Sequence, residues 1–89
     1  MMTGTNEIRS AVRHFIVSNY LPGESPENLK DDTPLRTSGI LDSMSTLAVV
    51  SFVEERFGVS LEAHETGIEH FDRIEDIAAL VERKQQAGA

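Results

Sequence analysis

The chain has 89 residues, which is enough for one small domain built around a single core. It contains no cysteine, which excludes disulfides and thiolate metal sites and agrees with a cytoplasmic location. With 8 Lys and Arg against 15 Asp and Glu, its formal net charge of −7 disfavours nucleic acid and anionic membranes and favours a basic protein partner.

The N-terminal segment 1–7 lacks both the basic and the apolar region of an export signal, and no apolar run approaches the roughly 20 residues that span a bilayer. We therefore expect neither export nor a membrane segment. A helix is predicted over about 5–20 and ends before Pro22 and Gly23. Its apolar residues follow the i, i+3, i+4 spacing of one buried stripe: Ile8, Ala11, Val12, Phe15, Ile16 and either Asn19 or Tyr20.

Residues 21–41 form a long loop, because three prolines, two glycines and scattered charges disfavour any regular element there. A loop of this length is unusual in so small a domain unless packing or function accounts for it. We expect four apolar side chains to hold it over the helices: Leu29, Leu35, Ile40 and Leu41.

A second helix is predicted over about 43–57, with the Asp42 carboxylate as its N-cap and Gly58 as the left-handed residue that ends it. The stripe expected to be buried consists of Thr46, Val49, Val50, Val53 and Phe57. A neighbouring, more exposed face carries Met44, Leu47, Ala48 and Ser51.

A short third helix is predicted over about 64–70, broken by Gly67, and a fourth over about 73–84. Asp72 and Glu75 have the spacing of a capping box for the fourth helix. Its buried stripe is predicted to be Ile74, Ile77, Ala78 and Val81. Three longer helices and one short helix that share their apolar stripes predict an all-α four-helix bundle, a single domain over 1–89.

Ser43 is a candidate site of modification, because it places a hydroxyl group at the start of the second helix. Unpaired N–H groups and a partial positive charge at a helix N-terminus favour a phosphate attached there. The alternative is that its hydroxyl simply caps the helix. A hydrolase nucleophile would need Gly-x-Ser-x-Gly, which this sequence lacks, so no catalytic residue is predicted.

No metal site is predicted either. His64 and His70 are six residues apart, which places them on different faces of a helix. Asp31 and Asp32 lack the acidic spacing and the closing glutamate of a calcium loop.

The motif Gly39-Ile-Leu-Asp-Ser43, followed by a helix that ends in Glu54-Glu-Arg-Phe-Gly58, resembles the phosphopantetheine attachment region of acyl and peptidyl carrier proteins. The resemblance extends from Ile8 to about Leu80 and includes the segments 32–35 and 71–77. The chain looks most similar to stand-alone, type II carriers of antibiotic pathways that hold an amino acid or a small acyl unit, such as prolyl or pyrrolyl carriers.

This resemblance implies a non-catalytic, monomeric carrier. A phosphopantetheinyl transferase would attach 4′-phosphopantetheine from coenzyme A to Ser43, and Asp42 would help to present that serine. An adenylating enzyme or an acyltransferase would load the cargo as a thioester. Downstream synthases or tailoring enzymes of polyketide or nonribosomal peptide biosynthesis would then receive it.

The sequence departs from the carrier pattern at the face that partners contact. Carriers often have acidic residues two and five positions after the serine, where this chain has Ser45 and Ala48. Met44 replaces the usual leucine, and packing and partner contact are equally good readings of it. We therefore expect partners to recognise Met44, Leu47, Ala48 and Ser51 by shape and apolar contact.

Two alternatives remain open at the level of sequence. The first is a carrier of another pathway, of the D-alanyl or fatty-acid type, for which the same motif would serve. The second is an unmodified helical adaptor in which Ser43 only caps its helix.

Overall fold

The computed structural model describes residues 4–87. Residues 1–3, which belong to the N-terminal segment examined above for an export signal, lie outside this range. Within this range the chain forms four α-helices and no strand, which confirms the predicted all-α fold. The elements in order are α1 (Thr5–Tyr20), the 3₁₀ turn η1 (Pro26–Asn28), α2 (Ser43–Phe57), the 3₁₀ turn η2 (Ala63–Thr66), α3 (Ile68–Phe71) and α4 (Ile74–Ala87). No helix in 4–87 is long and apolar enough to cross a bilayer.

The helices α1 and α2 occupy the ranges predicted from their apolar periodicity. The segment predicted as a short third helix broken at Gly67 consists of η2 and α3, with Gly67 in an extended backbone conformation between them. The predicted end of the fourth helix near Lys84 is wrong, since α4 continues to Ala87. The extra residues include two glutamines and an alanine, which are good helix formers, and the sequence places no glycine or proline among them.

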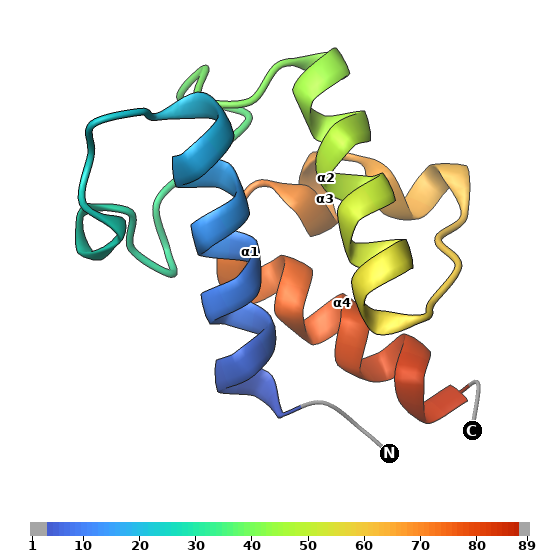
Figure 1. Cartoon of the computed structure of the whole chain (residues 1–89). Helices are drawn as coiled ribbons and strands as arrows, with labels where there is room; N and C mark the ends of the chain where they lie inside the picture. Colours follow the sequence, from blue (N-terminus) through green and yellow to red (C-terminus); the bar gives the residue numbers. More distant parts are fainter. Residues whose placement is uncertain (1–3, 88–89) are drawn as a thin grey trace.

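The core lies where α1, α2 and α4 meet. Figure 1 shows how these three helices are arranged. All nine residues predicted for the stripes of α2 and α4 are buried. In α1 the stripe is centred on Ile8, Val12 and Ile16, with Val17 as an unpredicted member and Tyr20 rather than Asn19 partly buried. Phe15 of α1 also stacks on Phe52 of α2, with ring centroids 4.3 Å apart.

The end of α2 is shaped by Gly58, which has the left-handed conformation predicted for it (φ 66°). Its backbone N–H donates to the Glu54 carbonyl oxygen at 3.0 Å. The Glu54 carboxylate in turn accepts a hydrogen bond from the Leu61 N–H at 2.8 Å. These contacts turn the chain back toward η2, so that the segment after α2 packs beside the helix.

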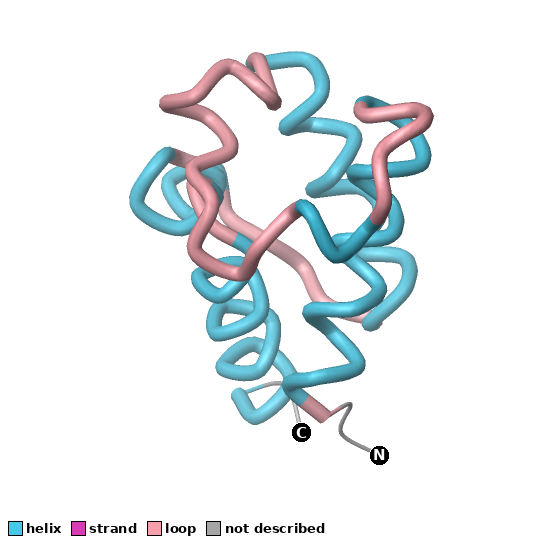
Figure 2. The backbone as a smooth tube through the Cα atoms, turned by 90° about the vertical axis from the view of Figure 1, so that its left-hand side faces the viewer, coloured by secondary structure: helices cyan, strands magenta, loops and turns pink. Residues whose placement is uncertain are grey.

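The long connection between α1 and α2 lies against the helices, as the pink tube in Figure 2 shows. Three of the four predicted apolar residues, Leu29, Leu35 and Leu41, are buried, and Ile40 packs partly buried against the core. The loop therefore contributes to the hydrophobic core, which explains why a small domain retains so long a connection.

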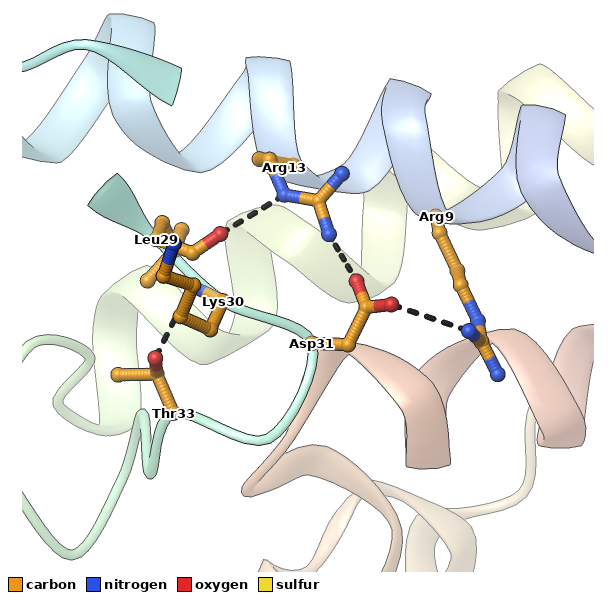
Figure 3. Close-up of polar contacts among 6 residues, drawn as sticks. All are labelled: Arg9, Arg13, Leu29, Lys30, Asp31 and Thr33. Carbon is orange, nitrogen blue, oxygen red and sulfur yellow. Dashed lines mark hydrogen bonds and ion pairs between the residues drawn. The ribbon is translucent and has the colours of Figure 1, made fainter. Parts of the chain in front are cut away.

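Asp31 fixes the middle of this connection to α1 (Figure 3). Its carboxylate forms ion pairs with Arg13 and, at 3.0 Å, with Arg9. Arg13 also donates through Nε to the Leu29 carbonyl oxygen at 2.8 Å. One aspartate thus joins two successive turns of α1 to the loop.

The same loop is hydrogen-bonded to the junction between α3 and α4. The Asp31 carbonyl oxygen accepts from the Glu75 N–H at 3.1 Å, and the Asp72 carbonyl oxygen accepts from the Leu35 N–H at 2.6 Å. The Asp72 carboxylate accepts from the N–H groups of Arg36 and Thr37 at 2.9 and 3.0 Å. Loop and junction therefore satisfy each other's exposed backbone groups.

These contacts show that the predicted capping box of Asp72 and Glu75 is wrong. The Glu75 N–H was expected to donate a hydrogen bond to the Asp72 carboxylate, but it donates to the Asp31 carbonyl oxygen. The Asp72 carboxylate is used by the loop instead. The sequence pattern pairs these two residues with each other, whereas their partners in the structure lie in the loop, at least 35 positions earlier in the chain.

The charge of Asp72 should stabilise the fold in a pH-dependent way. The Thr37 N–H is the largest cause that lowers the pKa of Asp72 below its ordinary value of 3.8, and the Arg36 N–H adds to it. An aspartate whose pKa is lower in the folded chain stabilises it above the unfolded pKa, and this contribution is lost as the pH falls through the folded pKa.

We expect Asp72→Asn to lower the free energy of unfolding at pH 7 by about 1 kcal/mol, because neutral acceptors bind N–H groups less strongly and solvent screens this partly exposed side chain. Urea unfolding from pH 7 to pH 3 measures the effect, and the gap to wild type should close below pH 3.8. Asp32→Asn is the control, because Asp32 is exposed next to Asp31. Equal effects of the two variants, or a gap independent of pH, would contradict this role.

Candidate functional site

The start of α2 is fixed by a reciprocal pair of contacts between Asp42 and Ser45. The Ser45 N–H donates to Oδ1 of Asp42 at 2.8 Å, and the Asp42 N–H donates to Oγ of Ser45 at 2.8 Å. Thr46 adds a bond from its Oγ1 to the Asp42 carbonyl oxygen at 2.6 Å. Asp42 is therefore the N-cap of α2, as predicted, and Ser45 completes a capping box that the sequence analysis missed.

The Asp42 carboxylate is poorly suited to act as a base. Hydrogen bonds from the backbone N–H and then from the hydroxyl of Ser45 lower its pKa below 3.8. It is consequently ionised at neutral pH and already engaged in holding the helix end. This makes it a structural anion one residue before Ser43.

Ser43 is the first residue of α2, is exposed, and does not cap the helix. Asp42 and Ser45 perform the capping, so the alternative in which Ser43 serves as the cap is wrong. Within residues 4–87 the Ser43 hydroxyl has no hydrogen-bond partner. The structure thus presents an accessible alcohol on a rigid helix end.

A shallow depression of about 320 Å³ adjoins this hydroxyl, and we call it the Ser43 depression. It lies between the loop, the first turns of α2 and the turn between η2 and α3. Its lining consists of Arg36, Ser43, Thr46, Leu47, Ala63, Thr66 and Gly67. An open depression beside a free hydroxyl leaves room for a linear group attached to Ser43, so the residues present fit the group that the sequence predicts.

Apolar side chains are exposed around the same end of the bundle. Met44 is 80% exposed and Leu47 61%, which agrees with their predicted place on an exposed face of α2. Ser51 is also exposed, whereas Ala48 is partly buried and offers less surface.

Ile68, at the start of α3 and directly after Gly67 of the depression, is 51% exposed. The sequence analysis missed it. A helix of four residues has no apolar periodicity from which its exposed side could be identified.

The histidines do not form a metal site. Among the residues that the structure describes, no three His, Asp or Glu side chains gather in a way that could hold a metal ion. His64 is exposed in η2 and His70 partly buried in α3, on opposite sides of the break at Gly67.

The different roles of Ser43 and Ser45 can be tested by stability. We expect Ser45→Ala to lower the unfolding temperature by a few degrees, because it removes one side of the capping box. Ser43→Ala should leave it unchanged, because it removes no hydrogen bond. Thermal unfolding followed by circular dichroism gives both values. A larger loss in Ser43→Ala than in Ser45→Ala would show that Ser43 has the capping role.

No protein-family model matches this chain, and no curated protein matches it either. Among solved structures it is similar to a chain in a crystal structure described as that of an FAD-dependent dehydrogenase. The two chains are 36% identical, the match covers 79% of this chain and 97% of that chain, and the TM-score is 0.70. At this identity and coverage, the protein belongs to the same family of small, all-helical, four-helix domains as that chain.

Proposed function

We propose that this protein is a discrete carrier that holds an acyl or aminoacyl intermediate on a phosphopantetheine arm attached to Ser43. The observation that carries the proposal is the Ser43 hydroxyl itself: it is exposed, makes no hydrogen bond in the described chain, and begins a helix whose cap is formed by its neighbours. It stands within the sequence motif that resembles the attachment region of carriers. A serine needed for the fold would be engaged, and this one is available for modification.

Attachment requires little from this chain. The Ser43 Oγ forms a bond to the phosphorus of coenzyme A that carries the pantetheine, and the bond from that phosphorus to the bridging oxygen of the diphosphate breaks, which releases adenosine 3′,5′-bisphosphate. The hydroxyl proton passes to a base of the transferase, because the Asp42 carboxylate is held by Ser45 and has a lowered pKa. Once attached, the arm supplies a terminal thiol on which cargo is carried as a thioester.

The chain then acts as a substrate of its partner enzymes and catalyses nothing itself. An adenylating enzyme or an acyltransferase loads the thiol, and synthases or tailoring enzymes of polyketide or nonribosomal peptide biosynthesis use the cargo. Tethering replaces diffusion of a free intermediate by delivery at high effective concentration. We place the protein in the cytoplasm as a monomer, where its net charge of −7 suits partners with basic surfaces.

One partner in this proposal is an FAD-dependent dehydrogenase. The similar chain comes from a crystal structure that is described as that of such an enzyme. Such an enzyme would remove two hydrogens from the tethered cargo while FAD becomes FADH₂. We assign the flavin to the partner because a dinucleotide site of the Rossmann type needs parallel strands and a Gly-x-Gly-x-x-Gly turn. This sequence has no such motif, and residues 4–87 contain no strand.

The surface offered to partners consists of Met44, Leu47 and Ile68, the three large apolar side chains that are exposed in the described chain. They lie beside Ser43 or the depression next to it. Apolar anchors near the centre of an interface contribute most of its binding energy, and surrounding charges mainly steer the encounter. Ser51 extends this surface along α2, and Ala48 lies partly buried beneath it.

The alternative carriers, of the D-alanyl or fatty-acid type, share the same attachment chemistry. The two positions where carriers often present acidic residues hold Ser45 and Ala48, so they offer no charge here. Ser45 is part of the capping box and Ala48 is partly buried. This favours partners that recognise shape and apolar contact. The identity of the enzyme that loads the cargo would distinguish these carrier types from carriers of polyketide or nonribosomal peptide biosynthesis.

Modification of Ser43 is the first test. After incubation with coenzyme A and a broad-specificity phosphopantetheinyl transferase, the intact mass of the folded protein should rise by one phosphopantetheinyl group. Ser43→Ala should gain nothing, and Ser18→Ala, which removes an exposed hydroxyl of α1 outside the partner surface, should be modified like wild type. An unchanged mass of the folded wild-type protein would refute the carrier assignment.

The apolar surface gives a second test. We expect Leu47→Glu to slow the reaction of fully modified protein with its loading enzyme or dehydrogenase by about tenfold or more, because it replaces roughly 1.5–3 kcal/mol of apolar burial by a charge. Initial rates at low carrier concentration measure this.

Ala79→Glu adds the same charge at an exposed position of α4 and is the control for Leu47→Glu. Circular dichroism verifies that both variants fold. Equal rates for the two variants would place the docking surface elsewhere.

A further inference from the structure

The geometry points to Arg36 as the residue that holds the phosphate of the arm attached to Ser43. This inference rests on the proposed function, because the phosphate exists only once Ser43 is modified. It adds a binding residue that lies outside the attachment motif, seven positions before the serine and in the loop rather than in α2.

The two residues share one place in the fold. Arg36 and Ser43 both line the Ser43 depression, and its other five lining residues are uncharged: Thr46, Leu47, Ala63, Thr66 and Gly67. A phosphate bonded to the Ser43 Oγ is one covalent bond away from a residue that lines this depression, so it can enter the space beside Arg36. The guanidinium of Arg36 is therefore the cationic group lining the space that the phosphate enters.

The charges near Ser43 favour such a cation. The Asp42 carboxylate, one residue before Ser43, is ionised and already occupies the N-terminus of α2. Much of the favourable field that a helix N-terminus offers an anion is therefore compensated by Asp42. Attachment places a second negative charge beside the first, in a chain whose net charge is already −7. A neighbouring guanidinium offsets this repulsion.

Arg36 is both positioned and available. Its backbone N–H is fixed by the Asp72 carboxylate at 2.9 Å, while in the described chain its guanidinium takes part in no ion pair. Four of the other cationic side chains are engaged: Arg9 and Arg13 with Asp31, Arg73 with Glu75, and Lys84 with Glu65. A planar guanidinium can donate two parallel hydrogen bonds to phosphate oxygens, which suits this role better than an ammonium group.

Nuclear magnetic resonance of the purified full chain tests the inference without any partner enzyme. Conversion to the modified form, verified by intact mass, should shift the Nε–Hε resonance of Arg36 more than that of any other arginine. In Arg36→Gln the ³¹P resonance of the arm should move from its wild-type position and lose its dependence on salt concentration. Arg36→Lys should restore the salt dependence in part, because it keeps the charge without the paired donors.

Arg56→Gln is the matched control, since it removes the same charge from an exposed arginine at the opposite end of α2, roughly 20 Å from Ser43. All variants should fold, because the backbone contact to Asp72 does not need the Arg36 side chain. If modified wild type, Arg36→Gln and Arg56→Gln show the same ³¹P resonance, the inference is overturned while the carrier function stands. It is also overturned if Arg36→Gln only slows the transferase, because Arg36 then contacts that enzyme. A protein that gains no mass overturns both.

Discussion

The reciprocal attachment of the long loop to the junction between α3 and α4 determines the rest of this structure. Asp31 and Asp72 lie on opposite sides of that attachment, and each uses its carboxylate and its carbonyl oxygen for separate partners. Asp31 joins α1, the loop and α4, while Asp72 joins the α3–α4 junction to residues 35–37 of the loop. Ordering this segment costs conformational entropy, and charge-assisted hydrogen bonds and three buried leucines offset that cost.

This attachment also determines what Ser43 can do. The loop enters α2 directly after the buried Leu41, so the position of the helix start follows from the position of the loop. Asp42 and Ser45 then satisfy the helix end between them, which leaves the hydroxyl of Ser43 unused and exposed. The same loop places Arg36 at the edge of the Ser43 depression. The elements that stabilise the fold thus surround one exposed alcohol with a cation, an anion and an apolar rim.

Much of this fold could be predicted because helical periodicity is a local property of sequence. The buried stripe of α2 was predicted residue by residue, that of α4 was predicted except for Leu80, and the caps Asp42 and Gly58 were predicted as well. The errors concern partners that are distant in sequence or choices between neighbours. Asp72 has the correct spacing for a capping box, yet loop N–H groups compete for its carboxylate. Ser43 was considered as a possible cap, whereas Asp42 is the N-cap and the Ser45 hydroxyl accepts from the Asp42 N–H. Ile68 and Arg36 lie in short or irregular segments, where no period marks the exposed side.

Amide hydrogen exchange of the whole chain, resolved by residue, tests the central claim most directly, because it reports which backbone groups are bonded in solution. The account predicts slow exchange at Leu35, Arg36, Thr37 and Glu75, whose N–H groups join the loop to the junction, and fast exchange at Ser43 on the exposed helix end. Fast exchange throughout residues 35–37 and at Glu75, together with protection of Ser43, would contradict it.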